Sequence, residues 1–540
     1  MVTSSALSRR FLIVIGLLGV VLLLLQLDGP FDDAGGWNGT WVSTCARNHV
    51  KYGLGSTQAA CVMNTDFSEP EEFRYYVHHP PGIHLTVAAS FLLFGEHEWA
   101  ARVVPMLFTI GTFVLFFLLL RLLYDTDTSL LATTILAVLP MVILAGSMVN
   151  HEAPSGFFIL LVTYALERWQ GEHKRRWLGI AAGGFLVGAQ FGWPVFYLAG
   201  LYPLLHLLAR RNIRETLRLW WLPALAVVAF AVFVAQTSAA VGEQAMPVLA
   251  QTFLLRTTGG NPYSEEGMSA RLTRSGGQPL SDAQEEQVTW AGWSVRHIRR
   301  FLTLFGLPVL LLAGYWLIST LSNMPLRRND LVLVFLSLLG LAHILLFRQG
   351  AFQHWYWSYY LSFGLAAAAA RGTRLLYHDR SGMTNTDRGQ ALSVLIALLI
   401  AGNTFIALRD LTAHSRVGLL PRDLIIPSLL RADARWTVAW EVGRVIDSVE
   451  LPGGAVATNL PFNGPQLAYY ARRRVFFADD LPEAGQFDRW ARRNDVAGFA
   501  LLARGAEGDE WMSRLESYAL LRKTAVLEDT LRVYSIQSRR

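Results

Sequence analysis

The sequence predicts an α-helical polytopic membrane protein with about eleven transmembrane helices and a small α/β domain at its C-terminal end. Of its 540 residues, 52% are hydrophobic and 16% are charged, a balance too apolar for a soluble protein. The apolar residues form blocks long enough to cross a bilayer, and basic clusters recur between these blocks. The last part of the chain lacks such blocks and carries short runs typical of β-strands.

The predicted membrane spans are apolar runs separated by polar turns. They lie at 11–27, 98–123, 128–149, 154–169, 178–191, 194–209, 217–237, 301–319, 330–347, 356–371 and 390–408. The first run follows Arg9 and Arg10, and its length and poor cleavage site favour a retained span over a signal peptide. The run 82–94 is too short to cross, so we expect a juxtamembrane helix on the outer surface.

Basic side chains set the predicted orientation. With Met1 in the cytoplasm, the cytoplasmic loops contain Arg9/Arg10, Arg121, Lys174/Arg175/Arg176, Arg210/Arg211/Arg214, Arg327/Arg328 and Arg371/Arg374/Arg380/Arg388. We therefore expect a multi-pass protein of the plasma (inner) membrane with a cytoplasmic N-terminus and an extracytoplasmic C-terminal domain. The net charge of +6 follows largely from this topology, and no nucleic-acid motif or partner is predicted.

Two domains are predicted from these patterns. Residues 1–408 form the transmembrane domain, with a first outer loop at 28–98 that contains juxtamembrane helices and a second outer loop at 238–300. Residues 409–540 form the extracytoplasmic α/β domain, because β-type runs alternate there with helical stretches. These β-type runs lie at 455–458, 475–477, 496–502 and 531–536.

Three arginines at the end of the second outer loop, Arg296, Arg299 and Arg300, contradict the charge rule that places basic residues inside. An anionic ligand would explain them. Snorkelling of arginines at the start of a membrane helix explains them equally simply.

The chain has two cysteines, Cys45 and Cys61, and both fall in the first outer loop. An oxidising compartment would allow them to form a disulfide. Chance co-location is the alternative.

The first candidate site segment is Arg74-Tyr-Tyr-Val-His-His-Pro-Pro-Gly82. Neither proline fits inside a helix, and each forces the residue before it into an extended conformation. His78 and His79 are therefore presented on a bent segment just outside the membrane, at the start of the following helix. Such a segment is typical of a binding site rather than of a membrane span.

Candidate general bases follow the first span in Leu27-Asp-Gly-Pro-Phe-Asp-Asp33. A carboxylate near the bilayer surface has its pKa raised by partial burial and can then accept a proton from a substrate. Asp32 and Asp33 are the candidates for this role. Acidic loop residues that are simply solvated are the alternative.

Two further polar clusters fall at predicted outer ends of spans. Glu152 follows His151 and precedes a proline, at a depth where charge is expensive, so it marks either a site or a hydrogen-bonded turn. Arg348 and His354 flank an aromatic segment that fits an interfacial belt. A cation and a hydrogen-bond donor at the interface suit a lipid phosphate.

The outer histidines also raise the question of a metal. No close i, i+4 ligand pair and no recognised metal motif is present, so we assign no metal ligands and no certain cofactor. A bound divalent metal is kept as an alternative.

Four motifs together resemble the membrane-embedded C-type (GT-C) glycosyltransferases of the protein O-mannosyltransferase and aminoarabinose transferase-like family, which use polyprenyl-phosphate sugars. The motifs are Asp32-Asp33 followed by the segment Trp41 to Gly53, His79-Pro-Pro81 with a surface helix ending at Gly95, Glu98-Trp-Ala-Ala-Arg102-Val-Val-Pro105, and Asn150-His-Glu152. The resemblance covers most of residues 10–370. One departure concerns the acidic motif: the family spacing before the arginine that matches Arg47 falls on Asn38-Gly39 here.

The resemblance implies transfer of a sugar from a polyprenyl phosphate to an acceptor hydroxyl on the extracytoplasmic face, with inversion. Because polyprenyl phosphate is already an adequate leaving group, the enzyme needs a base for the acceptor and donors for the departing phosphate. We expect Asp33 as the base with Asp32 second, and Glu152 to orient the acceptor or the sugar. The expected lipid-phosphate ligands are His78, His79, Arg102, Arg348 and His354. The acceptor is a lipid, a glycan or a protein.

Three other functions remain open. A transporter or flippase of a lipid-linked or anionic glycan is also polytopic, but it should carry broken helices and charges near the bilayer midplane, whereas the polar clusters here lie at the outer surface. A glycan polymerase or ligase that uses diphosphate-linked oligosaccharides is the second alternative. A non-catalytic partner with a protein-binding outer domain is the third.

Overall fold

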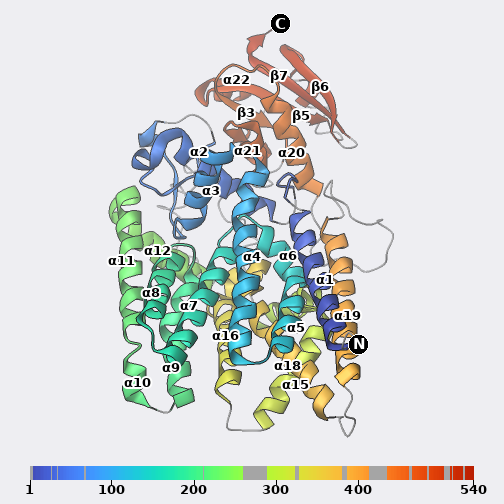
Figure 1. Cartoon of the computed structure of the whole chain (residues 1–540). Helices are drawn as coiled ribbons and strands as arrows, with labels where there is room; N and C mark the ends of the chain where they lie inside the picture. Colours follow the sequence, from blue (N-terminus) through green and yellow to red (C-terminus); the bar gives the residue numbers. More distant parts are fainter. Residues whose placement is uncertain are drawn as a thin grey trace.

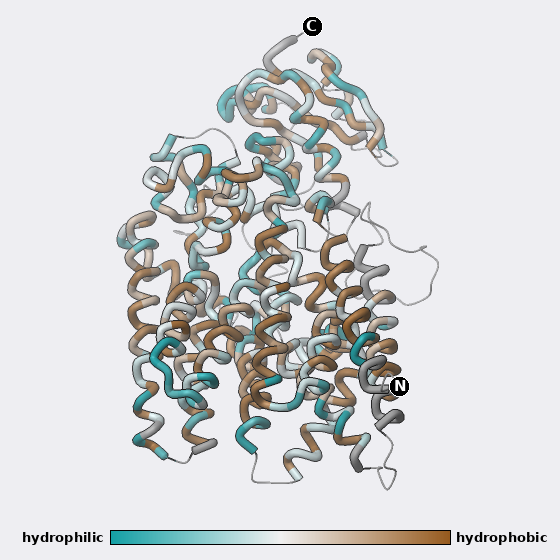
Figure 2. The backbone as a smooth tube through the Cα atoms, in the orientation of Figure 1, coloured by the Kyte–Doolittle hydropathy of each residue, from teal (hydrophilic) through white to brown (hydrophobic). Residues whose placement is uncertain are grey.

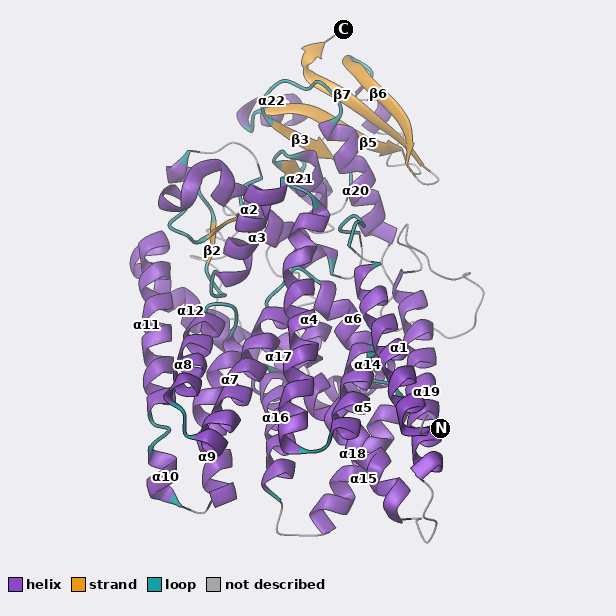
Figure 3. Ribbon diagram, viewed as in Figure 1, coloured by secondary structure: helices purple, strands orange, loops and turns teal. Residues whose placement is uncertain are grey.

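The computed structural model describes residues 4–25, 27–32, 35–65, 69–210, 212–258, 289–322, 327–379, 386–412, 434–460, 465–482, 486–503, 511–513, 515–526 and 529–539. Helices form the body of the molecule, and a sheet with its own helices lies over one end of that body (Figure 3). We call this the upper end, following its place in Figure 1.

The helices of the body carry long apolar stretches, which are brown in Figure 2. In chain order they are α1 (Ser4–Leu24), α4 (Glu98–Leu123), α5 (Thr126–Ala137), α6 (Pro140–Ser147), α7 (Glu152–Glu172), α8 (Arg175–Ala189), α9 (Leu198–Arg210), α10 (Ile213–Leu217), α11 (Trp221–Val241), α12 (Ala245–Thr258), α14 (Trp290–Leu304), α15 (Leu307–Ser322), α16 (Arg328–Leu346), α17 (Arg348–Gln353), α18 (Leu361–Asp379) and α19 (Thr386–Thr412). Short 3-10 turns join some of them, including η2 (Trp193–Tyr197), η3 (Gly242–Gln244) and η5 (Trp355–Tyr360).

Three helices are long and apolar enough to cross a membrane: α4, the stretch Trp221–Thr258 made of α11 and α12, and α16. Two bent pairs, α5 with α6 and α14 with α15, raise the number to five if each pair is one span. Over the described residues the structure therefore supports a mostly helical membrane protein. The predicted number of eleven spans is not confirmed.

Both bends have a cause in the sequence. Pro140 is the first residue of α6, and Leu139 before it is extended (φ −69°, ψ 130°), so α5 ends and the chain turns by 63°. Between α14 and α15, Gly306 has a φ of +79°, a conformation that favours glycine, and the two helices meet at 106°.

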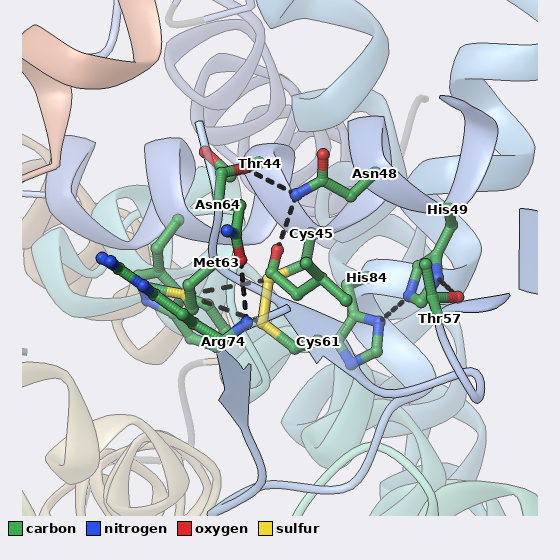
Figure 4. Close-up of a disulfide and its surroundings, with 12 residues drawn as sticks. Thr44, Cys45, Asn48, His49, Thr57, Cys61, Met63, Asn64, Arg74 and His84 are labelled. Atoms are coloured by element: carbon green, nitrogen blue, oxygen red, sulfur yellow. Dashed lines mark hydrogen bonds between the residues drawn. A yellow bond between two sulfur atoms is a disulfide. The ribbon is translucent and has the colours of Figure 1, made fainter. Parts of the chain in front are cut away.

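The first outer segment covers the upper end of the body (Figure 1). It consists of α2 (Gly36–Ser56), a hairpin of β1 (Cys61–Val62) and β2 (Tyr75–Tyr76), the short turn η1 (Pro70–Glu72), and α3 (Gly82–Phe94). The helix expected at 82–94 is thus present with the expected bounds. A disulfide joins Cys45 of α2 to Cys61 of β1, so these cysteines pair (Figure 4).

Two buried histidines link α2 to α3 beside this disulfide (Figure 4). Thr57 Oγ1 donates to the carbonyl of Gly53, so it accepts from Nδ1 of His49 at 2.7 Å. Nε2 of His49 then accepts from Nδ1 of His84 at 2.8 Å. Burial lowers the pKa of His49 to about 4 and that of His84 well below its usual value. The pair is therefore neutral at pH 7.

The C-terminal part contains a five-stranded sheet in the order β4-β3-β5-β7-β6. Its strands are β3 (Ala455–Thr458), β4 (Val475–Phe476), β5 (Val496–Ala503), β6 (Tyr518–Val526) and β7 (Asp529–Arg539), and its helices are α20 (Ala434–Asp447), α21 (Gln466–Ala471) and α22 (Phe487–Arg493), with the turn η6 (Ala478–Asp480). β3 pairs in parallel with β4 and β5, and the other pairs are antiparallel. α19 continues to Thr412, past the predicted boundary at 408, and the division into domains stays a prediction.

The disulfide yields a first prediction. It closes a segment with a sequence separation of 16 residues, and a crosslink of that length stabilises a folded chain by about 3 kcal/mol in the loop-entropy picture. We expect a reducing agent to lower the thermal melting temperature of the wild-type protein in detergent. The double variant Cys45→Ala, Cys61→Ala should melt at the lower temperature and should not respond to the reductant. An equal response of both proteins would contradict this role.

Candidate functional site

Polar side chains from five elements meet at the upper end of the body, and we call them the polar cluster. They come from α2, the segment around β2, the start of α7, α12 and the segment 354–356. The cluster comprises Asn38, Trp41, Tyr76, His78, His79, His151, Glu152, Thr252, Arg256, His354 and Tyr356.

His78 is anchored by α12. Thr252 Oγ1 donates to the carbonyl of Val248, so it accepts from Nδ1 of His78, 2.5 Å away. The carbonyl of His78 accepts from Nε1 of Trp193 at 3.1 Å. The segment bends here as predicted: Pro81 is the N-cap of α3, and before it His78 meets α12 while His79 meets His151 at the start of α7.

Aromatic rings line one side of the cluster. His79 stacks on His151 with 4.4 Å between ring centroids, and Nδ1 of His151 donates to the carbonyl of Phe191 at 2.7 Å. Trp41 lies 4.8 Å from Tyr76 and 6.1 Å from His151, centroid to centroid. These contacts pack His79 against other aromatic rings rather than leaving it in solvent.

Glu152 is the first residue of α7 and is 3% exposed. Its Oε2 has no hydrogen-bond partner among the described residues, although the atom is buried. Burial raises the pKa of Glu152 to about 8, so the carboxyl group is mostly protonated at pH 7 unless a ligand or cation stabilises its charge. A buried carboxylate with a free oxygen is available to accept a hydrogen bond from a ligand hydroxyl.

A hydrogen-bonded chain runs across the other side of the cluster. Arg256 Nη1 donates to Gln353 Oε1 at 3.1 Å and to Nε2 of His354 at 2.8 Å. Nδ1 of His354 therefore carries the proton and donates to the Tyr356 hydroxyl at 2.9 Å. That hydroxyl points at Oδ1 of Asn38, 3.5 Å away, which also accepts from the Trp41 indole at 3.2 Å.

The histidines of the outer segments are held neutral. Burial lowers the pKa of His78 to about 4, with a further contribution from the positive charge of Arg256. Burial and Arg256 also lower the pKa of His354 well below its usual value, and burial with the neighbouring His151 does the same for His79. At pH 7 these imidazoles are hydrogen-bonding groups, and Arg256 supplies the positive charge.

The structure places two of the predicted phosphate ligands elsewhere. The guanidinium of Arg102 donates to the carbonyls of Gly29 and Pro30 and lies 4.5 Å from the ring centroid of Phe31. The guanidinium of Arg348 lies 4.5 Å from the ring centroid of Trp290. The guanidinium that contacts His354 is that of Arg256, so these contacts do not bring Arg102, Arg348 and His354 together.

The predicted bases lie before α2. Asp32 is 1% exposed and follows Phe31, whose ring lies against Gly39. Asp33 lies outside the described residues. Asn38 occupies the position at which the family spacing expects an acid, and it contributes an amide to the cluster instead.

The outer arginines of α14 have a structural explanation. Arg300 Nη1 donates to the carbonyl of Ala351 at 2.7 Å, and Arg296 Nη1 donates to that of Phe352 at 3.0 Å. Both arginines therefore satisfy carbonyls in the last turn of α17, where cations are favoured. An anionic ligand is not needed to account for these two side chains.

Among the described residues, no group of three or more His, Cys, Asp or Glu side chains is arranged to hold a metal ion. The divalent metal kept as an alternative therefore has no ligand set there.

Several members of the cluster were missed in the sequence. Thr252 and Arg256 are four residues apart on an apolar helix, a spacing that puts both on one face and would have marked α12. Asn38, Trp41, Tyr76 and Tyr356 carry no spacing signal, because their neighbours in space come from distant segments.

Known proteins resemble this chain in sequence and in fold. Residues 78–238 match the sequence model of the family described as "Dolichyl-phosphate-mannose-protein mannosyltransferase". The crystal structure of ArnT from Cupriavidus metallidurans matches with a TM-score of 0.58 and 12% identity over 97% of both chains. The chain therefore shares its fold with these glycosyltransferases, and part of it matches the mannosyltransferase family model. The part that matches the family model begins at His78 and includes Glu152 and Thr163.

Two more relatives extend the GT-C likeness. The oligosaccharyltransferase of Archaeoglobus fulgidus matches with a TM-score of 0.53 and 12% identity over 94% of this chain and 73% of that one. A Bacillus subtilis protein named "Putative mannosyltransferase YkcB" is 29% identical over 112 residues. Those residues are 21% of this chain, and the match spans only 15% of the length of that relative.

The lowered pKa of His78 leads to a pH prediction. Its folded pKa is about 4 and its ordinary value is 6.5, so the unfolded chain binds a proton more readily, and stability is full above pH 6.5 and lost as the pH falls toward 4. Between pH 7 and pH 5 this one group should cost at most about 2 kcal/mol.

Melting curves at the two pH values test this expectation. His78→Asn keeps a donor for Thr252 and removes the titration, so its melting temperature should fall less on acidification than that of the wild type. The exposed His173→Asn is the control and should behave as the wild type. If His78→Asn shows an undiminished fall, the neutral state of His78 is not what acid disrupts.

Proposed function

We propose that this protein transfers a sugar from a polyprenyl-phosphate donor to an acceptor hydroxyl on the extracytoplasmic face of the membrane. One observation carries the proposal: the half-buried Arg256 and His354 pair lies in the same polar cluster as the buried Glu152, at the upper end of helices long enough to cross a membrane. A cation suits a lipid phosphate, and a carboxylate suits the hydroxyl groups of a sugar or an acceptor.

The donor class has further support from the fold. The ArnT structure bound to undecaprenyl phosphate matches this chain with a TM-score of 0.56 and 13% identity over 97% of both chains. In our chain, Arg256 donates to two neutral acceptors, Gln353 Oε1 and His354 Nε2. An incoming phosphate would replace them by charge-assisted hydrogen bonds, which are stronger. The same anion would raise the pKa of His354 and allow it to donate as well.

The transfer step needs one base. The acceptor oxygen attacks the anomeric carbon, its proton passes to a carboxylate, and the bond to the phosphate oxygen breaks with the electron pair leaving on the phosphate. We assign the base to Asp33 or Asp32, from the resemblance of the acidic motif, and a single displacement of this kind inverts the anomeric centre. Glu152 is assigned to orient the acceptor or the sugar through its free Oε2.

The extracytoplasmic face is favoured by the disulfide. Disulfides persist in oxidising compartments, and Cys45 and Cys61 lie in the segment that contributes Trp41, Tyr76 and His78 to the cluster. The acceptor is proposed to be a lipid, a glycan or a protein that reaches the same face.

The base assignment predicts the effect of removing both carboxylates. Asp32→Asn with Asp33→Asn should lower the rate of sugar transfer by about 10² to 10⁴-fold, as expected for loss of a general base. The assay uses the full chain in nanodiscs, a panel of radiolabelled polyprenyl-phosphate sugars and acceptor membranes. Full turnover by the double variant would sink the base assignment. Movement of the lipid-linked sugar across the bilayer without transfer, already in the wild type, would support the transporter instead.

The phosphate assignment predicts a contrast between two arginines. Arg256→Gln should weaken binding of polyprenyl phosphate about tenfold or more, because a hydrogen bond from a charged group contributes roughly 1.5–3 kcal/mol. Arg348→Gln makes the same chemical change beside Trp290 and should leave binding within about twofold. Fluorescence-detected titration of a labelled polyprenyl phosphate measures both. A larger loss for Arg348→Gln would show that the ligand predicted from sequence is the correct one.

A further inference from the structure

We infer that Tyr470, in the C-terminal part of the chain, is a positioning residue for the segment Gly29–Asp32 and so for the carboxylate of Asp32. This inference rests on the proposed function, because it assumes that the acidic segment takes part in the transfer. The observation that carries it is a hydrogen bond across the chain: the backbone N–H of Phe31 donates to the Tyr470 hydroxyl at 2.8 Å.

The acidic segment has no regular secondary structure, so its position depends on contacts with other elements. Arg102 of α4 binds the carbonyls of Gly29 and Pro30. Tyr470 binds the next polar group along the chain, the N–H of Phe31. Three backbone polar groups in two consecutive peptide groups are therefore held, the two carbonyls by Arg102 of the helical body and the N–H of Phe31 by Tyr470 of the C-terminal part.

Packing around Phe31 makes the position of the segment sensitive to small changes. Phe31 is 1% exposed, and its ring meets Tyr469 edge-on with 5.9 Å between centroids. A Cβ added to Gly36 would lie 2.4 Å from the carbonyl oxygen of Phe31, and one added to Gly39 would lie 2.3 Å from its ring. These glycines let α2 approach the segment, and any larger residue there would push it away.

The helix that carries Tyr470 is built into the body. Tyr469 and Tyr470 of α21 belong to the same apolar core as α2, α4 and α7, whereas the sheet has two cores of its own. The guanidinium of Arg47 lies 4.3 Å from the Tyr469 ring centroid and donates to the Tyr469 carbonyl at 3.3 Å. Its Nε also donates to Glu96 at 2.7 Å. The contact is thus a packed interface.

Asp32 follows Phe31 directly and is itself buried, so its carboxylate moves whenever the Phe31 peptide moves. The ring of Phe31 also lies against Gly39, the neighbour of Asn38 in the polar cluster. Loss of the Tyr470 hydroxyl would leave the Pro30–Phe31 peptide held on one side only, by Arg102 at the Pro30 carbonyl. Small misplacements of a reacting group are costly, with about 10²-fold lost for a shift of 1 Å.

The test is Tyr470→Phe in the full chain reconstituted in nanodiscs. We expect kcat for sugar transfer to fall by about ten- to a hundredfold, with KM for the donor and the affinity for polyprenyl phosphate within about twofold. Tyr518→Phe is the matched control, since it removes a buried tyrosine hydroxyl that donates to Asp488 inside the C-terminal part. It should keep full kcat. An equal loss of kcat in both variants, or none in Tyr470→Phe, overturns the inference.

A second measurement separates this inference from the proposed function. Hydrogen–deuterium exchange of peptides containing Phe31 should speed up in Tyr470→Phe and not in Tyr518→Phe, whether or not the protein transfers sugar. Unchanged exchange at Phe31 overturns the positioning role. If exchange at Phe31 is faster in Tyr470→Phe but the wild-type protein transfers no sugar, the proposed function is wrong and the Phe31–Tyr470 contact still stands. If Tyr470→Phe does not fold, Gly36→Ala displaces Phe31 from the opposite side, and unchanged kcat in that variant would equally overturn the inference.

Discussion

Arginines that bind backbone carbonyls hold segments at the upper end of this molecule in place. Arg102 binds two carbonyls of the acidic segment, Arg300 and Arg296 bind the last turn of α17, and Arg47 binds the carbonyl of Tyr469 in α21. Arg102 is buried, and its pairing satisfies both partners, because a guanidinium out of water needs acceptors and an irregular backbone out of water needs donors. The other carbonyls lie near helix ends, where the helix itself leaves them without a partner.

The same rule sorts the arginines by function. Arginines whose N–H groups donate to backbone carbonyls already serve to hold the fold. Arg256 instead donates to the neutral side-chain amide of Gln353 and the neutral imidazole of His354. Neutral side-chain acceptors are readily exchanged for an anion, while the carbonyls of a loop are not. This difference separates Arg256 from Arg102 and supports our assignment of Arg256 to the phosphate.

The sequence predicted what depends on local chemistry. The apolar helices, the bend before α3, the pairing of Cys45 with Cys61 as one of two options, and the polar character of Glu152 and His354 all follow from short windows. It missed Arg256, Asn38 and Tyr356, because the side chains that they contact in the cluster come from segments far away in the sequence. The predicted number of eleven spans stays a prediction, since three helices, or five if each bent pair is one span, pass by length and composition among the described residues.

The hydrogen bond between Phe31 and Tyr470 has a consequence for how the protein is made. The two residues are separated by 439 positions, so the acidic segment emerges from the ribosome long before its partner exists. Contacts between such distant residues form late, because the intervening chain must first be ordered. A nascent chain that has made all the helices of the body would still lack the Tyr470 contact of the acidic segment, and synthesis of the C-terminal part would supply it.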